Sequence, residues 1–448
     1  MDYFPETEID GSPLPEVLDL HVSIDSRLVK PGDIFVCIKG EKTDGHQHIP
    51  MAIQHGAIGF LVNRKVDIPS HLFQIITTCS VESIQKAAAK ILKESSIKQI
   101  AITGSAGKTT TKELLFLIFS QFTRAAKTLG NYNTPIGVPI SIINMENDCQ
   151  VFICELSASY PGEINQNLTF MDLEHAIITG IGSSHLEFFG STQKIFNEKM
   201  KITNAIQKNG FLLINGDQPW GKDAKSIFPN TLSFGMNQEN DIQAIIKKKN
   251  QQGTVFQLRI VDQLTVDWEI KTFGDHFIYD AIPGIFLALH HRISSETIQQ
   301  ALSLFQAEKG RGKVIPWINE STIIDESYNA NPHSFAMSLL SFQSCPFSRK
   351  IAVIGDMLEL GPSTEKLHYE LGKLVQLASV DLVIYRGQYG NFIKDAIRNS
   401  NIQYCSFDNN QAIERYLVSI VKKGDGILIK ASNGIGLQEL VKLLEIHK

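Results

Sequence analysis

The side chains best suited to chemistry lie in a short stretch of small, basic and hydroxyl residues, GSAGKTT at positions 104–110. Glycines let the backbone approach a polyphosphate closely, and the loop amides and following helix present positive dipoles to it. Lys108 adds a point charge, and the Thr109 hydroxyl can ligate Mg²⁺. Ile102 stands where the strict phosphate-loop pattern has its first glycine, so an ordinary glycine turn before a helix is the alternative.

The flanking residues predict the elements that position this loop. A mainly β-branched run at 100–103 predicts a strand before it. After it, Leu114, Leu115, Ile118 and Phe122 recur on one face of a predicted helix. The stretch is therefore expected to fold as strand, phosphate loop and helix.

Two more candidate ligands, Glu155 and His185, follow apolar strand-like runs, VFICEL and HAIITGIG. The carboxyl ends of parallel strands share one edge of a sheet, so both residues and the phosphate loop can meet at one metal-phosphate site. A single Glu or His in such a place is more often structural. Three such groups together favour the functional interpretation.

Two basic residues are less easily assigned from the sequence. Lys199 lies on a predicted helix, and its surroundings indicate an ordinary surface lysine. The segment KGRGK at 309–313 predicts either a simple hinge or a loop that delivers Arg311 to a phosphate, which a planar guanidinium suits.

Length and charge exclude several classes of protein. A chain of 448 residues with net charge −5 is expected to form two to four domains, and its longest basic cluster, 247–249, disfavours a nucleic-acid or anionic-membrane surface. The N-terminus lacks the features of a signal peptide and no apolar run has membrane-spanning length, which predicts a soluble cytoplasmic protein. Six scattered cysteines without a CxxC pair indicate free thiols.

The pattern of elements predicts an α/β fold with three domains, at residues 1–96, 97–309 and 310–448. The first is a small unit with polar clusters at strand ends, 23–27 and 39–46, which are either solvated loops or ligand contacts. The second contains the phosphate loop and an antiparallel insertion within 231–270. The third is Rossmann-like, but without a GxGxxG fingerprint, so a second dinucleotide site is disfavoured.

Seven segments together resemble the Mur ligase family, in that family's order: SIDSRLVKPGDIFVCIKGEKTDGHQHI, GSAGKTTTKE, GNYNTPIGVP, ELSASYPGEI, GSSHLEFFGS, DESYNANPHS and GDMLELG. The resemblance implies an N-terminal UDP-sugar domain, a central P-loop ATPase-like domain with a parallel sheet and a C-terminal Rossmann-like domain. ESYNANPHS is similar to the branch that adds D-alanyl-D-alanine to UDP-N-acetylmuramoyl-tripeptide through an acyl phosphate. The resemblance also implies a cytoplasmic monomer that acts in peptidoglycan precursor synthesis.

The resemblance implies roles for individual residues. The phosphates of ATP would contact the phosphate loop, Gly104, Ser105, Ala106, Gly107, Lys108, Thr109 and Thr110, and the nucleotide would also contact Arg311 and Asp325. Two Mg²⁺ ions would be held by Thr109, Glu155, His185 and a carbamylated Lys199. Lys108, Lys199 and His185 would be catalytic. The sugar-peptide substrate would contact Ser26, Arg27, Lys39, Asp44, His46 and Asn331.

Several positions depart from the family pattern. Phe277 and Asp280 stand where asparagines are frequent, Gly180 replaces a frequent Asn, and Asn433 replaces an expected Arg. Two other classes therefore stay open. One is a different ligase, adding a diamino acid or acting like a folylpolyglutamate synthase, and the other is a non-catalytic nucleotide-binding module.

Overall fold

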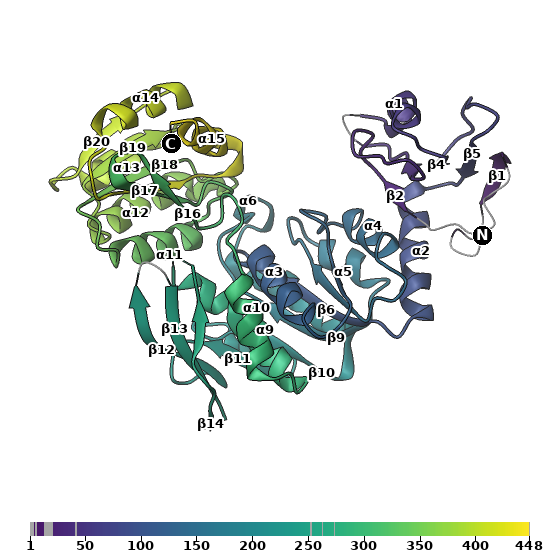
Figure 1. Ribbon diagram of the computed structural model, residues 1–448, viewed down its shortest axis with the longest axis horizontal. Coiled ribbons are helices and arrows are strands. Elements are labelled where there is room, and N and C mark those ends of the chain that lie inside the picture. The colour runs from purple at the N-terminus through teal and green to yellow at the C-terminus, as the bar shows by residue number, and fades with distance from the viewer. Residues whose placement is uncertain are drawn as a thin grey trace.

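The computed structural model describes residues 4, 7–12, 21–40, 43–250, 253–261, 263–272 and 274–447. Most of the N-terminal stretch 1–20 lies outside the described residues. Three sheets with their helices follow one another along an open arc, with the N-terminal unit at one end and the C-terminal unit at the other (Figure 1). Among the described residues, no helix combines the length and the hydrophobicity needed to cross a membrane.

The N-terminal sheet has the strand order β1-β5-β4-β3-β2. Its strands are β1 (Glu8–Gly11), β2 (Val22–Ser23), β3 (Ile34–Val36), β4 (Gly59–Val62) and β5 (Phe73–Ile76), and its helices are α1 (Ile49–Gln54) and α2 (Ser80–Glu94). Only β1 is antiparallel to its neighbour. The expected strands and the helix at 81–92 are confirmed. The sequence pattern missed β1 and β5.

The central sheet has the order β14-β13-β12-β11-β10-β9-β6-β8-β7, and β15 pairs with β13. Its strands are β6 (Lys98–Thr103), β7 (Ala125–Lys127), β8 (Val151–Glu155), β9 (Leu173–Ile178), β10 (Ile206–Asn215), β11 (Thr231–Gly235), β12 (Ile242–Asn250), β13 (Gly253–Ile260), β14 (Gln263–Leu264) and β15 (Trp268–Ile270). Strands β6 to β12 pair in parallel, and β13 to β15 add antiparallel strands to the same sheet. The predicted insertion is therefore a sheet extension, and its first strand, β11, is parallel.

Helices cover both faces of the central sheet. The face with α3 (Lys108–Phe119), α9 (His276–His290) and α10 (Ser295–Leu304) forms one apolar core. The other face packs against α2 and against α4 (Gly137–Ile143), α5 (Glu163–Leu168), α7 (Thr192–Met200) and α8 (Gly221–Ile227). A short helix, α6 (Leu186–Phe189), follows β9. The parallel strands are thus buried on both sides, as parallel sheets require.

The C-terminal unit is a three-layer domain with strand order β16-β17-β21-β18-β19-β20, and only β16 is antiparallel to its neighbour. Its strands are β16 (Lys313–Trp317), β17 (Ser321–Asp325), β18 (Arg349–Gly355), β19 (Leu382–Arg386), β20 (Gln403–Ser406) and β21 (Asp425–Lys430). One face carries α11 (Pro332–Gln343), α12 (Thr364–Leu377) and α13 (Gly390–Ile397), and the other α14 (Asn410–Ile420) and α15 (Leu437–Glu445). The predicted Rossmann-like architecture is confirmed. Boundaries after residues 96 and 309 stay predictions.

The N-terminal unit is fastened to the central unit by polar and apolar contacts. The Asn144 side chain accepts from the Val22 amide and donates to the Val22 carbonyl, both at 2.8 Å. Beside this pair, Ile140 and Ile143 join the apolar core of the N-terminal sheet. Asn144, directly after α4, therefore holds the edge strand β2 in place.

We predict that Asn144→Ala loosens the N-terminal unit, because it removes two hydrogen bonds worth about 1 kcal/mol each. Limited proteolysis under mild urea should release this unit at lower denaturant than in the wild type. Asn204→Ala, at an exposed position, is the control and should behave as wild type. Equal cleavage of Asn144→Ala and wild type would contradict the assigned role.

Candidate active site

The loop between β6 and α3 has a backbone that only glycine adopts easily at two positions. Gly104 and Gly107 have φ of 157° and 82°, and a Cβ would collide with the Thr179 hydroxyl at Gly104 and with the Asp280 carboxyl at Gly107. Thr179 also donates to the Ala106 carbonyl. Neighbouring elements therefore hold the loop tightly against the sheet edge, as the sequence predicts for strand, loop and helix.

Two lysine side chains meet at one backbone carbonyl of this loop. Lys108 donates to the Gly104 oxygen over 2.8 Å, and Lys199 donates to the same atom over 3.2 Å. Burial lowers the pKa of Lys108, and the charge of Arg311 adds to that effect. Burial and the charge of Lys108 lower the pKa of Lys199 well below its usual value. The loop therefore gathers two amine donors where an anion can bind and stabilise their charged forms.

The interpretation of Lys199 as a surface lysine is wrong, since its side chain is only 2% exposed. Lys199 lies on α7 four residues after Ile195, which is also buried. That spacing puts both on one helix face. The spacing of Lys199 from Ile195 was the signal available in the sequence, although Glu198 on the same helix is also buried.

An oxygen-rich group lies beside the two lysines. Thr109 donates its hydroxyl to one oxygen of Glu155 over 2.8 Å, and Asn133 donates to the other over 2.9 Å. Glu155 is 3% exposed and raises the pKa of Lys108, so the two charges are close. Sequence reasoning assigned no role to Asn133, although it lies in one of the segments that carry the family resemblance.

Two further charged residues escaped the sequence analysis. Lys112, one helical turn after Lys108, is fully buried and donates to the carbonyls of Thr128 and Gly130 over 3.1 Å. Glu163 is 2% exposed and acts electrostatically on both Lys108 and Lys199. The i,i+4 spacing from Lys108 could have indicated Lys112, whereas only the fold reveals Glu163.

His185 belongs to the same electrostatic group. Its φ is 59°, in the left-handed region, and its Nδ1 lies 2.6 Å from a carboxylate oxygen of Glu359. Burial lowers the pKa of His185, helped by the charges of Lys108 and Lys199 and opposed by Glu359. The structure thus brings His185, Glu155 and the phosphate loop together at one sheet edge, and Glu359 arrives from the third domain.

Asp280 and Arg311 approach the loop from a different side. The hydroxyl of Thr111 lies 3.2 Å from the Asp280 carboxyl, and burial raises the pKa of that carboxyl well above its usual value. Arg311 stacks on the Tyr328 ring at 3.9 Å, and its charge reaches both Asp280 and Lys108. The asparagine that is frequent at this position in the family can donate a hydrogen bond. A protonated Asp280 can do the same.

Asp325, which is expected to contact the nucleotide, forms hydrogen bonds within the chain. It is 3% exposed, and its carboxylate accepts from the Gly310 amide over 2.7 Å and from the Ser327 hydroxyl over 2.6 Å. In this conformation Asp325 orders the segment that leads into Arg311.

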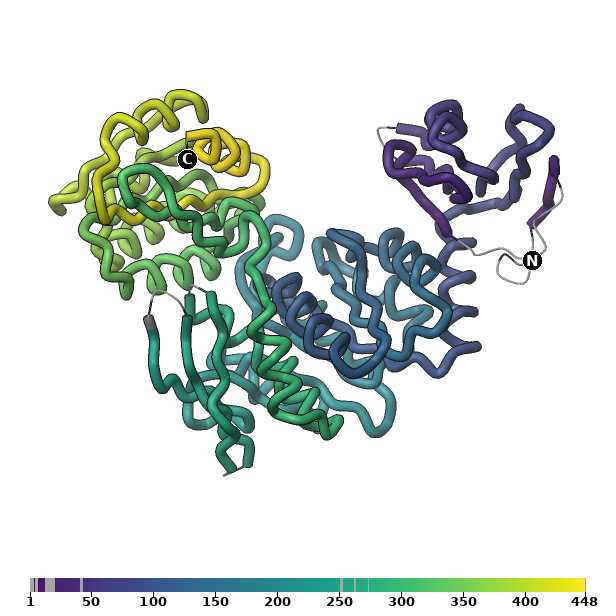
Figure 2. Tube along the Cα trace, in the orientation of Figure 1, coloured from purple at the N-terminus to yellow at the C-terminus, as the bar shows by residue number. Residues whose placement is uncertain are grey.

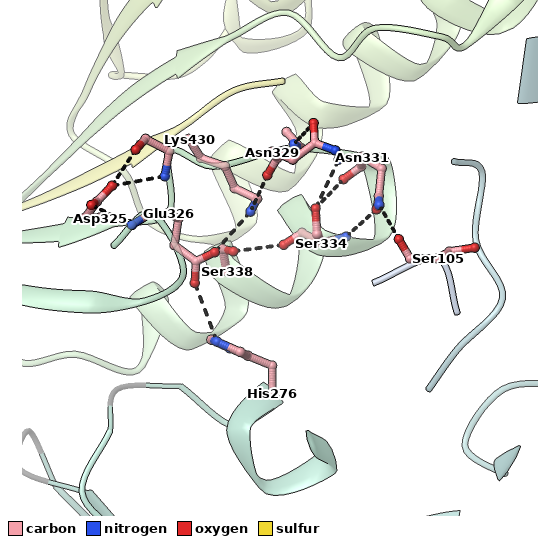
Figure 3. A network of polar contacts seen from close by, with 12 residues as sticks. Ser105, His276, Asp325, Glu326, Asn329, Asn331, Ser334, Ser338 and Lys430 are labelled. Atoms are coloured by element: carbon pink, nitrogen blue, oxygen red, sulfur yellow. Dashed lines mark hydrogen bonds and ion pairs between the residues drawn. The ribbon is translucent and has the colours of Figure 1, made fainter. Parts of the chain in front are cut away.

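Contacts between the second and third domains end directly on the phosphate loop (Figure 3). The Asn331 amide donates to the Ser105 carbonyl over 3.1 Å and to the Ser184 hydroxyl over 2.8 Å. The Ser105 hydroxyl accepts from the Gly182 amide over 2.9 Å. Thr110, on the first turn of α3, is also buried. Asn331 is therefore a domain contact in this conformation.

A second interdomain contact involves charged residues. Glu326 lies 3.0 Å from the Lys430 ammonium and 3.5 Å from the His276 ring nitrogen, as Figure 3 shows. Burial lowers the pKa of His276. Asn433, at the position where the family has Arg, donates to the Tyr328 carbonyl over 3.1 Å.

The residues expected to bind the sugar-peptide substrate, apart from Asn331, lie on the N-terminal unit, separate from the phosphate loop (Figure 2). The Asp44 carboxylate accepts from the His46 amide over 3.0 Å. The backbone of Asp44 forms an isolated antiparallel β-bridge with Lys39. Hydrogen bonds from His46 lower the pKa of Asp44. Arg27 pairs with Asp25 over 2.6 Å, and Ser26 contacts the sulfur of Met51.

A phosphate loop on a central parallel sheet, covered by a Rossmann-like domain and joined to a small N-terminal sheet, defines a three-domain nucleotide-dependent ligase. Three family models match in succession: Mur ligase family, catalytic domain (21–103), Mur ligase middle domain (102–288) and Mur ligase, glutamate ligase domain (310–433). The chain belongs to the Mur ligase family.

Relatives cover almost the whole chain. The UDP-N-acetylmuramoyl-tripeptide--D-alanyl-D-alanine ligase of Bacillus subtilis is 30% identical, over 94% of this chain and 92% of its own. The structure of MurF from Acinetobacter baumannii has a TM-score of 0.86, 26% identity and coverage of 97% and 95%. MurF from Thermotoga maritima in complex with ADP has a TM-score of 0.82, 28% identity and coverage of 97% and 99%.

We predict that Asn331→Asp opens the contact between the domains without destabilising the third domain. Aspartate keeps the oxygen that accepts from the Ser334 amide and caps α11, but it loses the donor to Ser105. Small-angle X-ray scattering should give a larger radius of gyration than wild type.

Asn331→Ala is the matched variant, because it also loses the helix cap and should lower the free energy of unfolding by about 1 kcal/mol. Scattering curves of Asn331→Asp that superimpose on wild type would show that the amide does not hold the domains together.

Proposed function

We propose that this protein is an ATP-dependent ligase that joins D-alanyl-D-alanine to UDP-N-acetylmuramoyl-tripeptide, a cytoplasmic step of peptidoglycan precursor synthesis carried out by a monomer. The observation that carries the proposal is the pair of lysines on the Gly104 carbonyl, beside the Glu155–Thr109 pair. The names of the relatives, which match over more than nine-tenths of each chain, support the substrates.

The chemistry begins with two anions, because the tripeptide carboxylate attacks the γ-phosphorus of ATP. That attack forms an acyl phosphate and breaks the bond to ADP. Lys108 and the loop amides reduce the repulsion by neutralising phosphate charge, and Arg311 is placed to add to this effect. The D-alanyl-D-alanine amine then attacks the acyl carbon, loses a proton and releases inorganic phosphate.

Residues suited to a hard cation surround the loop. Buried carboxylate and hydroxyl oxygens at Glu155 and Thr109 match the ligands that Mg²⁺ prefers. When bound, Mg²⁺ supplies charge neutralisation between the carboxylate and the phosphates. Glu155, Thr109, His185 and a modified Lys199 are proposed to hold two ions. An unmodified ammonium at Lys199 would repel them.

Lys199 is suited to carbamylation. Its lowered pKa provides neutral amine, whose nitrogen forms a bond to the carbon of CO₂ and loses a proton. The resulting carbamate carries a negative charge where the amine carried none, which turns the side chain into an oxygen ligand. It would also relieve the repulsion between Lys199 and Lys108.

The third domain and the N-terminal unit are proposed to hold the two other substrates. Ser26, Arg27, Lys39, Asp44 and His46 offer donors and charge for the UDP-sugar. Asn331 and Glu359 bring the third domain to the phosphate loop, and closure of this kind keeps water from the acyl phosphate.

The proposed reaction predicts a defined amine dependence. With ATP, Mg²⁺ and UDP-N-acetylmuramoyl-tripeptide carrying either lysine or diaminopimelate, phosphate release should require D-alanyl-D-alanine, and mass spectrometry should detect the pentapeptide product. Lys108→Ala should lose on the order of 100-fold or more in rate, since it removes a preorganised charge.

Other amines separate the rival functions. Turnover of UDP-N-acetylmuramoyl-dipeptide with a diamino acid, or of a folate with glutamate, would indicate a different ligase. ATP binding without phosphate release from any pair of substrates would indicate a non-catalytic module.

We predict that Lys199→Ala loses activity and that short carboxylates such as formate or acetate partly restore it, because they supply the missing oxygens. Wild-type protein held in bicarbonate should show the added mass of CO₂ on the peptide that contains Lys199 after chemical trapping. A fully active Lys199→Ala variant would refute the role of the modified side chain.

A further inference from the structure

Three potential metal ligands gather at the end of the central sheet opposite to the phosphate loop. Glu174 and His175 lie near the start of β9, whereas the phosphate loop lies beyond the carboxyl ends of the strands. His291 follows the last residue of α9. One donor atom from each residue lies within 4.8 Å of the other two.

Each of the three residues has a buried polar atom without a partner in the described part of the chain. Among the described residues, Glu174 Oε2, His175 Nε2 and His291 Nε2 have no hydrogen-bond partner, and His175 is only 2% exposed. A buried polar atom without a partner destabilises the folded state. Unpaired atoms on three neighbouring residues that could hold one metal ion point to a shared ligand.

The surroundings orient the donors. The other Glu174 oxygen accepts from Lys98 over 2.8 Å, which leaves Oε2 free for a ligand. His291 Nε2 lies 3.7 Å from Glu174 Oε2, too far for a direct hydrogen bond. This distance is close to the ~3.4 Å expected between adjacent ligands of a tetrahedral ion with bonds of about 2.1 Å.

The His175 ring offers one nitrogen to a ligand, because its Nε2 has no hydrogen-bond partner among the described residues. The Phe211 amide lies 3.4 Å from His175 Nδ1, at the long limit of a hydrogen bond. Metal binding through Nε2 would place the ring proton on Nδ1 and end that weak contact.

We propose that Glu174, His175 and His291 bind a divalent transition-metal ion, with Zn²⁺ as the cation that best fits two imidazoles and one carboxylate. Mg²⁺ and Ca²⁺ prefer oxygen ligands alone, whereas Zn²⁺ accepts nitrogen and oxygen together. Water can supply the fourth ligand.

The ion would join the end of α9 to the start of β9. The other half of α9 holds Asp280 against Gly107 of the phosphate loop. Zn²⁺ at this site is therefore a structural clamp that fixes α9 from the end remote from the nucleotide.

The experiment uses full-length protein from which a chelator has removed bound metal ions. Excess Mg²⁺ is then added so that it fills the magnesium sites before Zn²⁺ is titrated. Titration with Zn²⁺ should give one tight equivalent per chain and a higher melting temperature. Co²⁺ in place of Zn²⁺ should give visible absorption bands of a tetrahedral site.

His291→Asn should weaken Zn²⁺ binding by on the order of 100-fold and abolish the Co²⁺ bands, because outer contacts alone change metal affinity 10- to 100-fold. His71→Asn, at an exposed position of the N-terminal unit, should bind as wild type. Glu174→Gln gives a second, nearly isosteric ligand loss if His291→Asn misfolds. The absence of tight Zn²⁺ binding in wild type, or equal affinity in wild type and both ligand variants, would overturn the proposal.

Discussion

The repulsion between two lysine side chains at one carbonyl oxygen is the constraint on which this structure depends. Unit charges of the same sign about 4 Å apart repel by ~4 kcal/mol at an effective dielectric constant of 20. Lys108 and Lys199 tolerate this proximity because burial favours their neutral forms and because Glu155 and Glu163 lie nearby. The proximity of the two lysines destabilises the free protein, and the negative charge of a bound polyphosphate would offset it.

Rigid elements maintain this arrangement. Lys108 is the first residue of α3 and Lys199 lies in the last turn of α7, and the two helices pack on opposite faces of the central sheet. A buried helix cannot easily turn a lysine outward without breaking its apolar core. The two amine groups are therefore held beside the phosphate loop before any nucleotide arrives.

The third domain contributes residues to the site, but it also engages a residue that is expected to contact the nucleotide. Asn331 reaches the phosphate-loop backbone and Glu359 reaches His185, while Asp325 is engaged by the segment before Arg311. Asp325 therefore forms hydrogen bonds within the chain, and these would have to break before its carboxylate could contact a ribose. Domain motion is the usual way in which a multidomain enzyme achieves such a change.

The sequence alone was sufficient for the phosphate loop, the α/β class and the order of the elements, because these depend on local periodicity and on glycine, lysine and threonine at fixed spacing. It was insufficient for β1, β5 and β16, because strands of four or five residues offer few alternations for a period to mark them. It also misjudged Lys199, because a lysine is usually exposed, and only the packing of α7 shows that this one is covered.

The tertiary structure decided which charged residues share a site. Glu163 was not predictable as a neighbour of the lysines, nor Glu359 as a neighbour of His185, since the packing of distant segments brings them there. The same holds for His291, which lies more than a hundred residues after Glu174 and His175 and meets them only when α9 packs on the sheet. Local sequence specifies the chemistry that each residue can perform, but the burial and proximity that shift its charge state arise from long-range packing.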